Sequence, residues 1–196
     1  MRVRVLLGVV MLVAAARSAA AQEAGDVGVT MGYPGALGVV WHVTEGIALR
    51  PDIALTRSTS ESTTSATGGF GGPGLSSTST SEGWGTTVGL SVLLNVRTID
   101  RLRLYLAPRV AYAYSTTDNE SGFAGSLSAF TSKTRGVLAS GSFGSQYNVH
   151  DRFAIFGELG LQYTTQTTTS DFPGTRNEAD GTTVGLRSAV GVTFYF

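Results

Sequence analysis

The last thirteen residues, 184–196 (VGLRSAVGVTFYF), alternate strictly between two kinds of side chain. Every second position is apolar apart from one serine, and the positions between are small or polar. This period-two pattern places the two kinds on opposite faces of a β-strand. A soluble protein rarely ends on so apolar a strand, whereas in a membrane-spanning barrel lipid covers that face. The pattern therefore predicts the closing strand of a transmembrane β-barrel.

The first 21 residues have the features of a secretory signal peptide. Arg2 and Arg4 precede a short apolar run over 5–16, and Ala19-Ala20-Ala21 provides a cleavage site of small residues. The apolar run is shorter than the roughly 20 residues that a membrane-spanning helix needs. We therefore expect export, cleavage after Ala21, and a single mature domain over 22–196.

The charge balance argues against a nucleic-acid-binding protein. The chain has 14 basic and 14 acidic residues, and removal of the signal peptide deletes three arginines but no acid. The mature chain thus keeps 11 basic residues against 14 acidic ones, without the basic stripe of a nucleic-acid binder. Cysteine is absent, which excludes disulfides and cysteine-ligated metal centres. We expect no cofactor.

Alternating segments separated by turn residues predict an all-β, eight-stranded antiparallel up-and-down barrel. Short turns are expected near residues 45, 99 and 150, and long Ser/Thr/Gly-rich loops over 59–82, 116–133 and 167–181. Short periplasmic turns and long, mobile extracellular loops are typical of outer-membrane barrels, and an even strand count places both termini on the periplasmic side. The expected strands are 26–33, 36–44, 47–58, 83–96, 102–115, 134–149, 152–166 and 182–196.

A weak repeat supports this division into hairpins. Segments 46–58, 102–115 and 152–165 superpose on Pro51, Pro108 and Gly157, and each follows a short turn that contains an acidic residue. Repetition of this kind is typical of an up-and-down meander. Because proline removes a hydrogen bond from the ladder, we expect local bulges at Pro51 and Pro108.

The two faces differ in a way that predicts which one meets lipid. One face is aliphatic at its middle heights and aromatic near both ends, and the other is rich in glycine, alanine and serine. Two aromatic belts around an aliphatic band are typical of membrane interfaces. The alternative, a soluble lipocalin-like barrel with its apolar face inward, would carry many charges on its other face. The expected belts comprise Tyr33, Trp41, Trp84, Tyr112, Tyr114, Tyr147, Phe153 and Tyr163.

Six charged residues fall on the face predicted to point inward. Asp52, Arg109 and Glu158 occupy the same slot of the repeat, so they should lie at related heights. Unpaired charges are costly where water is scarce, so these groups should pair with one another. An eight-stranded barrel is just wide enough for side chains, which favours a salt-bridged plug over a charged, selective pore. The predicted lumen charge cluster is Arg50, Asp52, Arg103, Arg109, Glu158 and Arg187.

Two histidines raise the alternative of an enzyme. His42 falls on the inward face, in a slot where the other repeats carry Asn95 and Asn148, and His150 falls in a short turn. No metal-ligand spacing or nucleophile motif accompanies them. We therefore expect no catalytic residues.

The hairpins 38–55 and 143–163 and the closing segment GVTFYF (191–196) resemble the OmpA/OmpX-like family of outer-membrane β-barrel domains from Gram-negative-type bacteria. The resemblance implies that Val192, Phe194 and Phe196 form the signal read by the barrel-assembly machinery. The apolar outer face predicts outer-membrane lipid and lipopolysaccharide as surroundings, and we expect the Ser/Thr/Gly-rich loops to contact an extracellular partner. The expected function is a structural or surface-interacting barrel. The alternatives are a narrow small-solute or ion pore and a lipid-A-modifying barrel enzyme.

Overall fold

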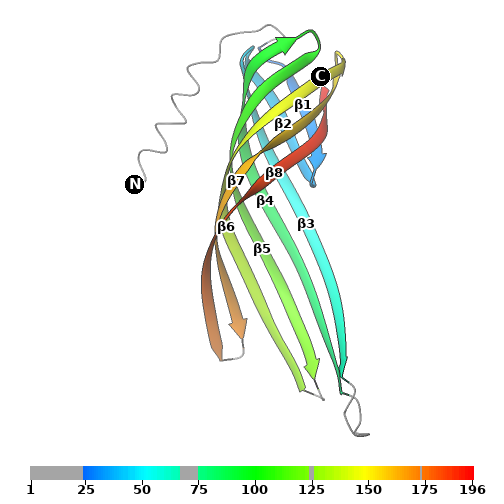
Figure 1. Ribbon diagram of the computed structural model, residues 1–196, viewed down its shortest axis with the longest axis vertical. Coiled ribbons are helices and arrows are strands. Elements are labelled where there is room, and N and C mark those ends of the chain that lie inside the picture. The colour runs from blue at the N-terminus through cyan, green and yellow to red at the C-terminus, as the bar shows by residue number, and fades with distance from the viewer. Residues whose placement is uncertain (1–23, 67–74, 124–125, 173) are drawn as a thin grey trace.

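Eight antiparallel strands form a closed barrel in chain order, as Figure 1 shows. The computed structural model describes residues 24–66, 75–123, 126–172 and 174–196, so the predicted signal peptide lies outside the described residues. The predicted eight-stranded up-and-down barrel is confirmed. Its strands are β1 (Val27–Tyr33), β2 (Ala36–Thr44), β3 (Ile47–Ala66), β4 (Leu75–Ile99), β5 (Leu102–Phe123), β6 (Ser126–His150), β7 (Phe153–Phe172) and β8 (Thr175–Tyr195).

The barrel closes between β1 and β8. Their register runs from Gly28 opposite Tyr195 to Tyr33 opposite Val190. The backbone N–H of Phe196 also donates to the carbonyl oxygen of Val27 at 3.1 Å. Segment 184–196 is therefore the closing strand that its alternation predicts.

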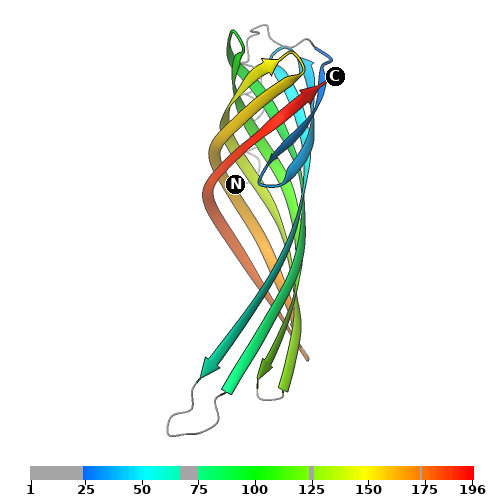
Figure 2. The ribbon, with the colours of Figure 1, turned by 90° about the vertical axis from the view of Figure 1, so that its right-hand side faces the viewer.

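The strands differ greatly in length. β1 and β2 have 7 and 9 residues, whereas β3 to β8 have 20 to 25. The long strands continue past the β1–β2 turn as a projecting sheet, which we define as the parts of β3–β8 beyond that turn (Figures 1 and 2). The prediction of long loops over 59–82, 116–133 and 167–181 is wrong for the described residues. Pairing continues to Ala66 opposite Leu75, and to Phe172 opposite Thr175.

Cross-strand side-chain pairs explain why these Ser/Thr-rich segments are strands. The hydroxyl groups of Ser132 and Ser170 lie 2.9 Å apart, and those of Thr134 and Thr168 lie 3.0 Å apart. At the far end the rings of Phe130 and Phe172 stack, with centroids 4.5 Å apart. Threonine also favours the extended backbone, and such cross-strand pairs stabilise a ladder.

Exposed and buried side chains alternate along the strands, and the apolar face points outward as predicted. Outward side chains in the ring are apolar and exposed, such as Leu159 at 62% and Val110 at 60%. Inward neighbours such as Ala111 at 4% are small and buried. The apolar face therefore covers the outside of the ring, and the small and charged residues line the lumen.

The predicted bulges at Pro51 and Pro108 are wrong. Pro51 pairs with Leu90 and Pro108 with Gly141 in unbroken register. The register of each proline strand with its other neighbour is also the same before and after the proline. A proline lacks one N–H, so the ladder can miss a bond there without gaining a residue.

Irregularities occur instead one step before each short turn, where the bulged residue is a valine: Val43, Val96 or Val149. Bulges bend the strand and increase its twist. The three positions are equivalent in the hairpin repeat, lying between His42 and Thr44, Asn95 and Arg97, and Asn148 and His150.

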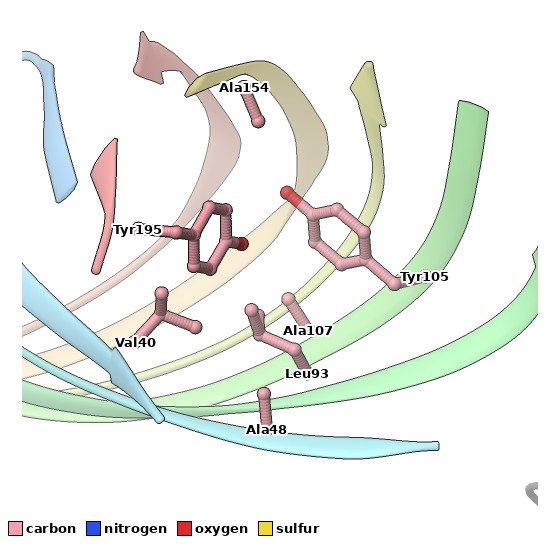
Figure 3. Close-up of a cluster of buried hydrophobic side chains, with 7 residues drawn as sticks. All are labelled: Val40, Ala48, Leu93, Tyr105, Ala107, Ala154 and Tyr195. Atoms are coloured by element: carbon pink, nitrogen blue, oxygen red, sulfur yellow. The ribbon is translucent and has the colours of Figure 1, made fainter. Parts of the chain in front are cut away.

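A buried apolar cluster fills the short-turn end of the lumen. Tyr105 and Tyr195 reach into the ring of strands from different sides and lie among small aliphatic residues (Figure 3). Each ring lies against a glycine on the neighbouring strand: Tyr105 on Gly144, and Tyr195 on Gly28. The cluster comprises Val40, Ala48, Leu93, Tyr105, Ala107, Ala154 and Tyr195.

Candidate functional site

Glu158 on β7 is the centre of a charged cluster inside the barrel. Its Oε1 lies 2.6 Å from Arg50 Nη2 and accepts a hydrogen bond from the hydroxyl of Tyr105 at 3.0 Å. Its Oε2 lies 3.0 Å from Arg187 Nη1, which also donates to Ser142 Oγ at 3.2 Å. The Glu158 side chain is 0% exposed. We call Arg50, Tyr105, Glu158 and Arg187 the lumen plug, because their side chains meet across the barrel axis.

A second ion pair lies next to the plug. Arg109 on β5 donates from Nε to Asp52 Oδ2 at 3.0 Å and from Nη2 to Oδ1, so the pair is bidentate. Bidentate arginine–carboxylate pairs are strong and geometrically specific. The guanidinium also lies over Gly89 of β4, where a Cβ atom would overlap it. A side chain at position 89 would therefore displace Arg109.

Arg103, the sixth residue of the predicted lumen charge cluster, lies toward the short-turn end of the lumen, where it lines a small cavity together with Tyr105. It shares the inward face of β5 with Arg109, but six residues nearer the short turn, which corresponds to about 20 Å along a strand. This small cavity of about 10 Å³ is also lined by His42, Asn95 and Gln146. That volume holds about one water molecule. Whether a position is odd or even along a strand therefore predicts which face its side chain is on, but not where it lies along the barrel axis.

The plug separates two cavities of very different size. The small cavity lies on its short-turn side and includes Tyr105 in its lining. A cavity of about 300 Å³ lies on the other side and includes Arg50, Arg109 and Arg187 in its lining. The two cavities share no lining residue. The lumen is therefore filled at one end and hollow at the other.

Phe156 is an inward aromatic residue that sequence reasoning missed. Its ring lies against Gly191 and Gly32 on the two next strands, and Arg50 lies over it at 5.3 Å from the ring centroid. A guanidinium at this distance from an aromatic face is attracted to it. The alternation along β7 could have predicted that Phe156 points inward, because it lies two residues from both Ala154 and Glu158, which are on the inward face.

The two histidines lie in different surroundings. His42 is buried in the small cavity, its ring 5.9 Å from that of Tyr195 and tilted by 47°. Its Nε2 has no hydrogen-bond partner among the described residues, so this nitrogen is not paired with a nucleophile. His150 is exposed at the end of β6. The structure therefore does not bring the histidines into a common site.

Nowhere in residues 24–66, 75–123, 126–172 and 174–196 do three or more histidine or acidic side chains gather closely enough to hold a metal ion. In the same ranges, no helix is long and apolar enough to cross a membrane.

Comparison with known proteins gives a likeness in structure only. No protein-family model matches the chain, and no curated protein matches it in sequence. A major outer membrane protein from Thermus thermophilus superposes with a TM-score of 0.56 at 15% identity, covering 87% of this chain and 98% of that one. The chain has the fold of an outer-membrane β-barrel.

Two further solved structures are similar at lower scores. CarO from Acinetobacter baumannii has a TM-score of 0.47 at 16% identity, covering 87% of this chain and 97% of that one. Ail, the attachment invasion locus protein of Yersinia pestis, has a TM-score of 0.38 at 13% identity, covering 87% and 94%. The predicted OmpA/OmpX-like family stays a prediction.

The residues expected to form the aromatic belts lie on the outer face of the barrel. Trp84 and Tyr114 contact each other with ring centroids 5.6 Å apart, and so do Phe153 and Phe194 at 5.0 Å. Trp41, Tyr112, Tyr147 and Tyr163 are exposed on this face, whereas Tyr33 is exposed beside the β1–β2 turn and also borders the cavity of about 300 Å³. Phe143 is an exception to the predicted arrangement, in which aromatic residues lie near the two ends of the outer face. It is exposed on that face but pairs with Leu106 and Leu159 in the aliphatic band.

Of the expected assembly residues, Val192 and Phe194 lie on the outer face of β8, and Phe196 follows directly after its last residue. Phe194 and Phe196 are exposed, and Val192 is half-buried. Val192 pairs with Ile155 of β7 and Met31 of β1. Val192 and Phe194 therefore share the apolar outer face of the closing strand.

Proposed function

We propose that this protein is a structural or surface-interacting β-barrel of the bacterial outer membrane, with a lumen that does not conduct. The observation that carries the proposal is the complete burial of Glu158 between Arg50, Arg187 and Tyr105. These contacts cross the axis of a barrel already narrow enough for side chains to fill. Ions have no continuous water-filled path through such a plug.

The outer face supports a location in the membrane. It exposes a largely aliphatic band, including Val88, Leu90, Val110, Leu159 and Leu161. Exposed apolar area on this scale is unfavourable in water and favourable against hydrocarbon chains. Two ends rich in aromatic residues match the interfaces of a bilayer. On this proposal the short turns and both termini face the periplasm.

The partners follow from the same placement. Outer-membrane lipid and lipopolysaccharide would cover the aliphatic band, and the barrel-assembly machinery would read Val192, Phe194 and Phe196 during insertion. The projecting sheet would then stand outside the cell, where its hydroxyl-rich surface can meet an extracellular partner. Strands present a more rigid surface than the mobile loops that the sequence suggested.

The second candidate, a narrow pore for ions or small solutes, is favoured by one observation. The cavity of about 300 Å³ reaches from the plug toward the long-hairpin end, which leaves only the plug and the small cavity to be crossed. Conduction would require Glu158 to release Arg50 or Arg187. Leaving either arginine unpaired in the lumen is costly, which favours the closed state.

Bilayer reconstitution tests the proposal. Purified protein is inserted into planar bilayers, and the same sample is run unheated and boiled on a gel to show that the barrel is folded. We expect folded protein without conductance steps, and small steps from the double variant Arg50→Ala, Glu158→Ala, which removes the central carboxylate of the plug and one of its arginines while balancing charge. The control double variant Arg176→Ala, Asp171→Ala removes an exposed ion pair and should stay silent. Steps from the unaltered protein would contradict the proposal.

A further inference from the structure

The 300 Å³ cavity has an opening that follows from the short first hairpin. β1 has 7 residues, fewer than the roughly 9 to 11 that a membrane-spanning strand needs. The wall between β3 and β8 therefore stops at the turn that contains Tyr33 and Pro34 (Figure 2). Both residues are exposed and line the cavity, so the cavity opens over this turn.

The strand edges on either side of the turn support a water-filled cavity. In the described residues, β3 pairs with β2 only as far as Ala54, and β8 pairs with β1 only up to Val190. Thr56 and Ser188, just past these points, line the cavity. Unpaired backbone groups at membrane depth are tolerated where they line a water-filled space. The opening therefore admits water and small polar groups.

The charges around this cavity do not balance. Three arginines, Arg50, Arg109 and Arg187, face two carboxylates, Asp52 and Glu158. Asp52 is taken by the bidentate contact of Arg109, and Glu158 is shared by the other two arginines. One positive charge is therefore left in a confined space, where an anion would be strongly attracted.

Arg187 is the arginine available to a ligand. Both of its contacts, with Glu158 and with Ser142, use Nη1. Its Nε and Nη2 are not engaged by a side chain in the described part of the protein, and its side chain is 19% exposed against 8% for Arg50 and Arg109. Two adjacent guanidinium nitrogens match the two oxygens of a carboxylate or phosphate.

Neutral groups complete the lining. Thr30, Thr87 and Gln162 can donate hydrogen bonds, and Phe156 provides an apolar wall. A few polar groups on an otherwise small-residue lining, in a volume of about 300 Å³, suit a small ligand. The plug forms the floor, so the cavity ends there.

We propose that this cavity is a dead-end binding site for a small oxyanion, a carboxylate or a phosphate, held by Arg187 and reached over the β1–β2 turn. Two sources offer this chemistry: a free solute from outside, and a phosphorylated lipid headgroup that passes the turn from the outer leaflet. Binding of the anion by Arg187 does not require a closed lumen, so the binding test and the conductance test can fail independently.

Calorimetric titration tests the site. Folded full-length protein in non-ionic detergent is titrated with inorganic phosphate and, separately, with acetate. Arg187→Gln removes the charge but keeps a hydrogen-bonding side chain, and should raise Kd about tenfold or more, the effect of losing a charge-assisted contact. Arg187→Lys should recover part of the affinity. Arg57→Gln, the same change at an exposed position of β3 outside the cavity, should leave Kd unaltered.

A second arm separates the sources. Protein is reconstituted in nanodiscs of phosphatidylcholine with or without phosphatidic acid, and native mass spectrometry records the lipid that stays bound. Ala54→Phe fills the cavity from β3, and the matched variant Leu55→Phe points outward. Retained phosphatidic acid that Ala54→Phe removes and Leu55→Phe keeps identifies the headgroup. Phosphate or acetate binding without retained lipid identifies a free solute.

Heat-modifiable gel mobility shows that each variant is folded. The proposal is wrong if neither inorganic phosphate, acetate nor phosphatidic acid binds to the unaltered protein. It is also wrong if Arg187→Gln leaves Kd unchanged, or if Ala54→Phe does not weaken binding.

Discussion

The closed ring and the projecting sheet have strands β3–β8 in common, yet different interactions hold the two regions together. In the ring, the two faces differ in character: the outside is aliphatic and aromatic, and the inside is mostly charged, polar or small. In the projecting sheet, hydroxyl pairs such as Thr134–Thr168 and the stack of Phe130 on Phe172 link neighbouring strands. The ring therefore depends on contacts across its lumen, whereas the sheet depends on contacts between adjacent strands.

This difference predicts that identical substitutions have unequal effects in the two regions. A substitution inside the ring leaves buried polar groups without hydrogen-bond partners. A substitution in the projecting sheet leaves exposed groups, and water can replace the hydrogen bonds that they lose. The effects below run from the largest to the smallest.

Removal of Glu158 should have the largest effect. Glu158→Ala leaves Arg50, Arg187 and the Tyr105 hydroxyl without their shared acceptor, which should cost about 3–5 kcal/mol. The measurement is the free energy of unfolding in urea from lipid vesicles. Glu178→Ala, the same change at an exposed position of β8 in the projecting sheet, should stay within about 0.5 kcal/mol. Equal losses would show that the lumen network does not hold the ring.

A single methyl group should distinguish the inside of the ring from the outside. Gly144→Ala places a Cβ atom against the ring of Tyr105 and should destabilise the barrel by about 1–3 kcal/mol. Gly141→Ala on the same strand meets nothing within 4 Å and should be nearly neutral. Urea unfolding measures the change in the free energy of unfolding for both variants. A neutral Gly144→Ala would mean that Tyr105 does not lie on this glycine.

Loss of an aromatic stack should affect only the projecting sheet. Phe130→Ala removes the contact with Phe172 and should locally cost about 1 kcal/mol. Amide hydrogen exchange should accelerate at the long-hairpin ends of β6 and β7 and stay unchanged around Glu158. Faster exchange throughout the ring would show that the two regions unfold together.

Loss of one hydroxyl pair should have the smallest effect. Thr134→Val keeps the β-branched shape but removes the 3.0 Å contact with Thr168, at a cost of about 0.2–1 kcal/mol. Thr134→Ser keeps the hydroxyl group but removes the methyl group, so it measures the effect of side-chain shape while the hydroxyl pair is retained. Amide hydrogen-exchange rates in β6 and β7 measure the effect of each substitution. If Thr134→Val slowed exchange, hydroxyl pairing would not be what holds this sheet.

The fold of the ring could be predicted because period-two alternation is a direct consequence of strand geometry. The strands of the projecting sheet could not, because their serines and threonines lack a contrast between faces. Composition does not separate a solvated Ser/Thr segment from one whose hydroxyl groups pair across strands. The pairs Ser132–Ser170 and Thr134–Thr168 become visible only once the register is known.

The candidate site was predictable in part. Parity along the strands places Arg50, Asp52, Arg109, Glu158 and Arg187 inside, and the structure brings these five together. Arg103 has the same parity but a different height, which depends on the stagger of the strands. The opening over the β1–β2 turn could not be foreseen, because it needs the lengths of β3 and β8 as well as that of β1.

The most direct test of the central idea is which face of the ring meets lipid. Methyl groups are labelled in protein reconstituted in nanodiscs, and nuclear relaxation is measured with and without a nitroxide on the lipid acyl chain. We predict much stronger broadening for Val110 and Leu159 than for Ala111 and Ala154, which are buried inside the ring on the same two strands. Broadening of the alanines with sharp signals from Val110 and Leu159 would contradict the account.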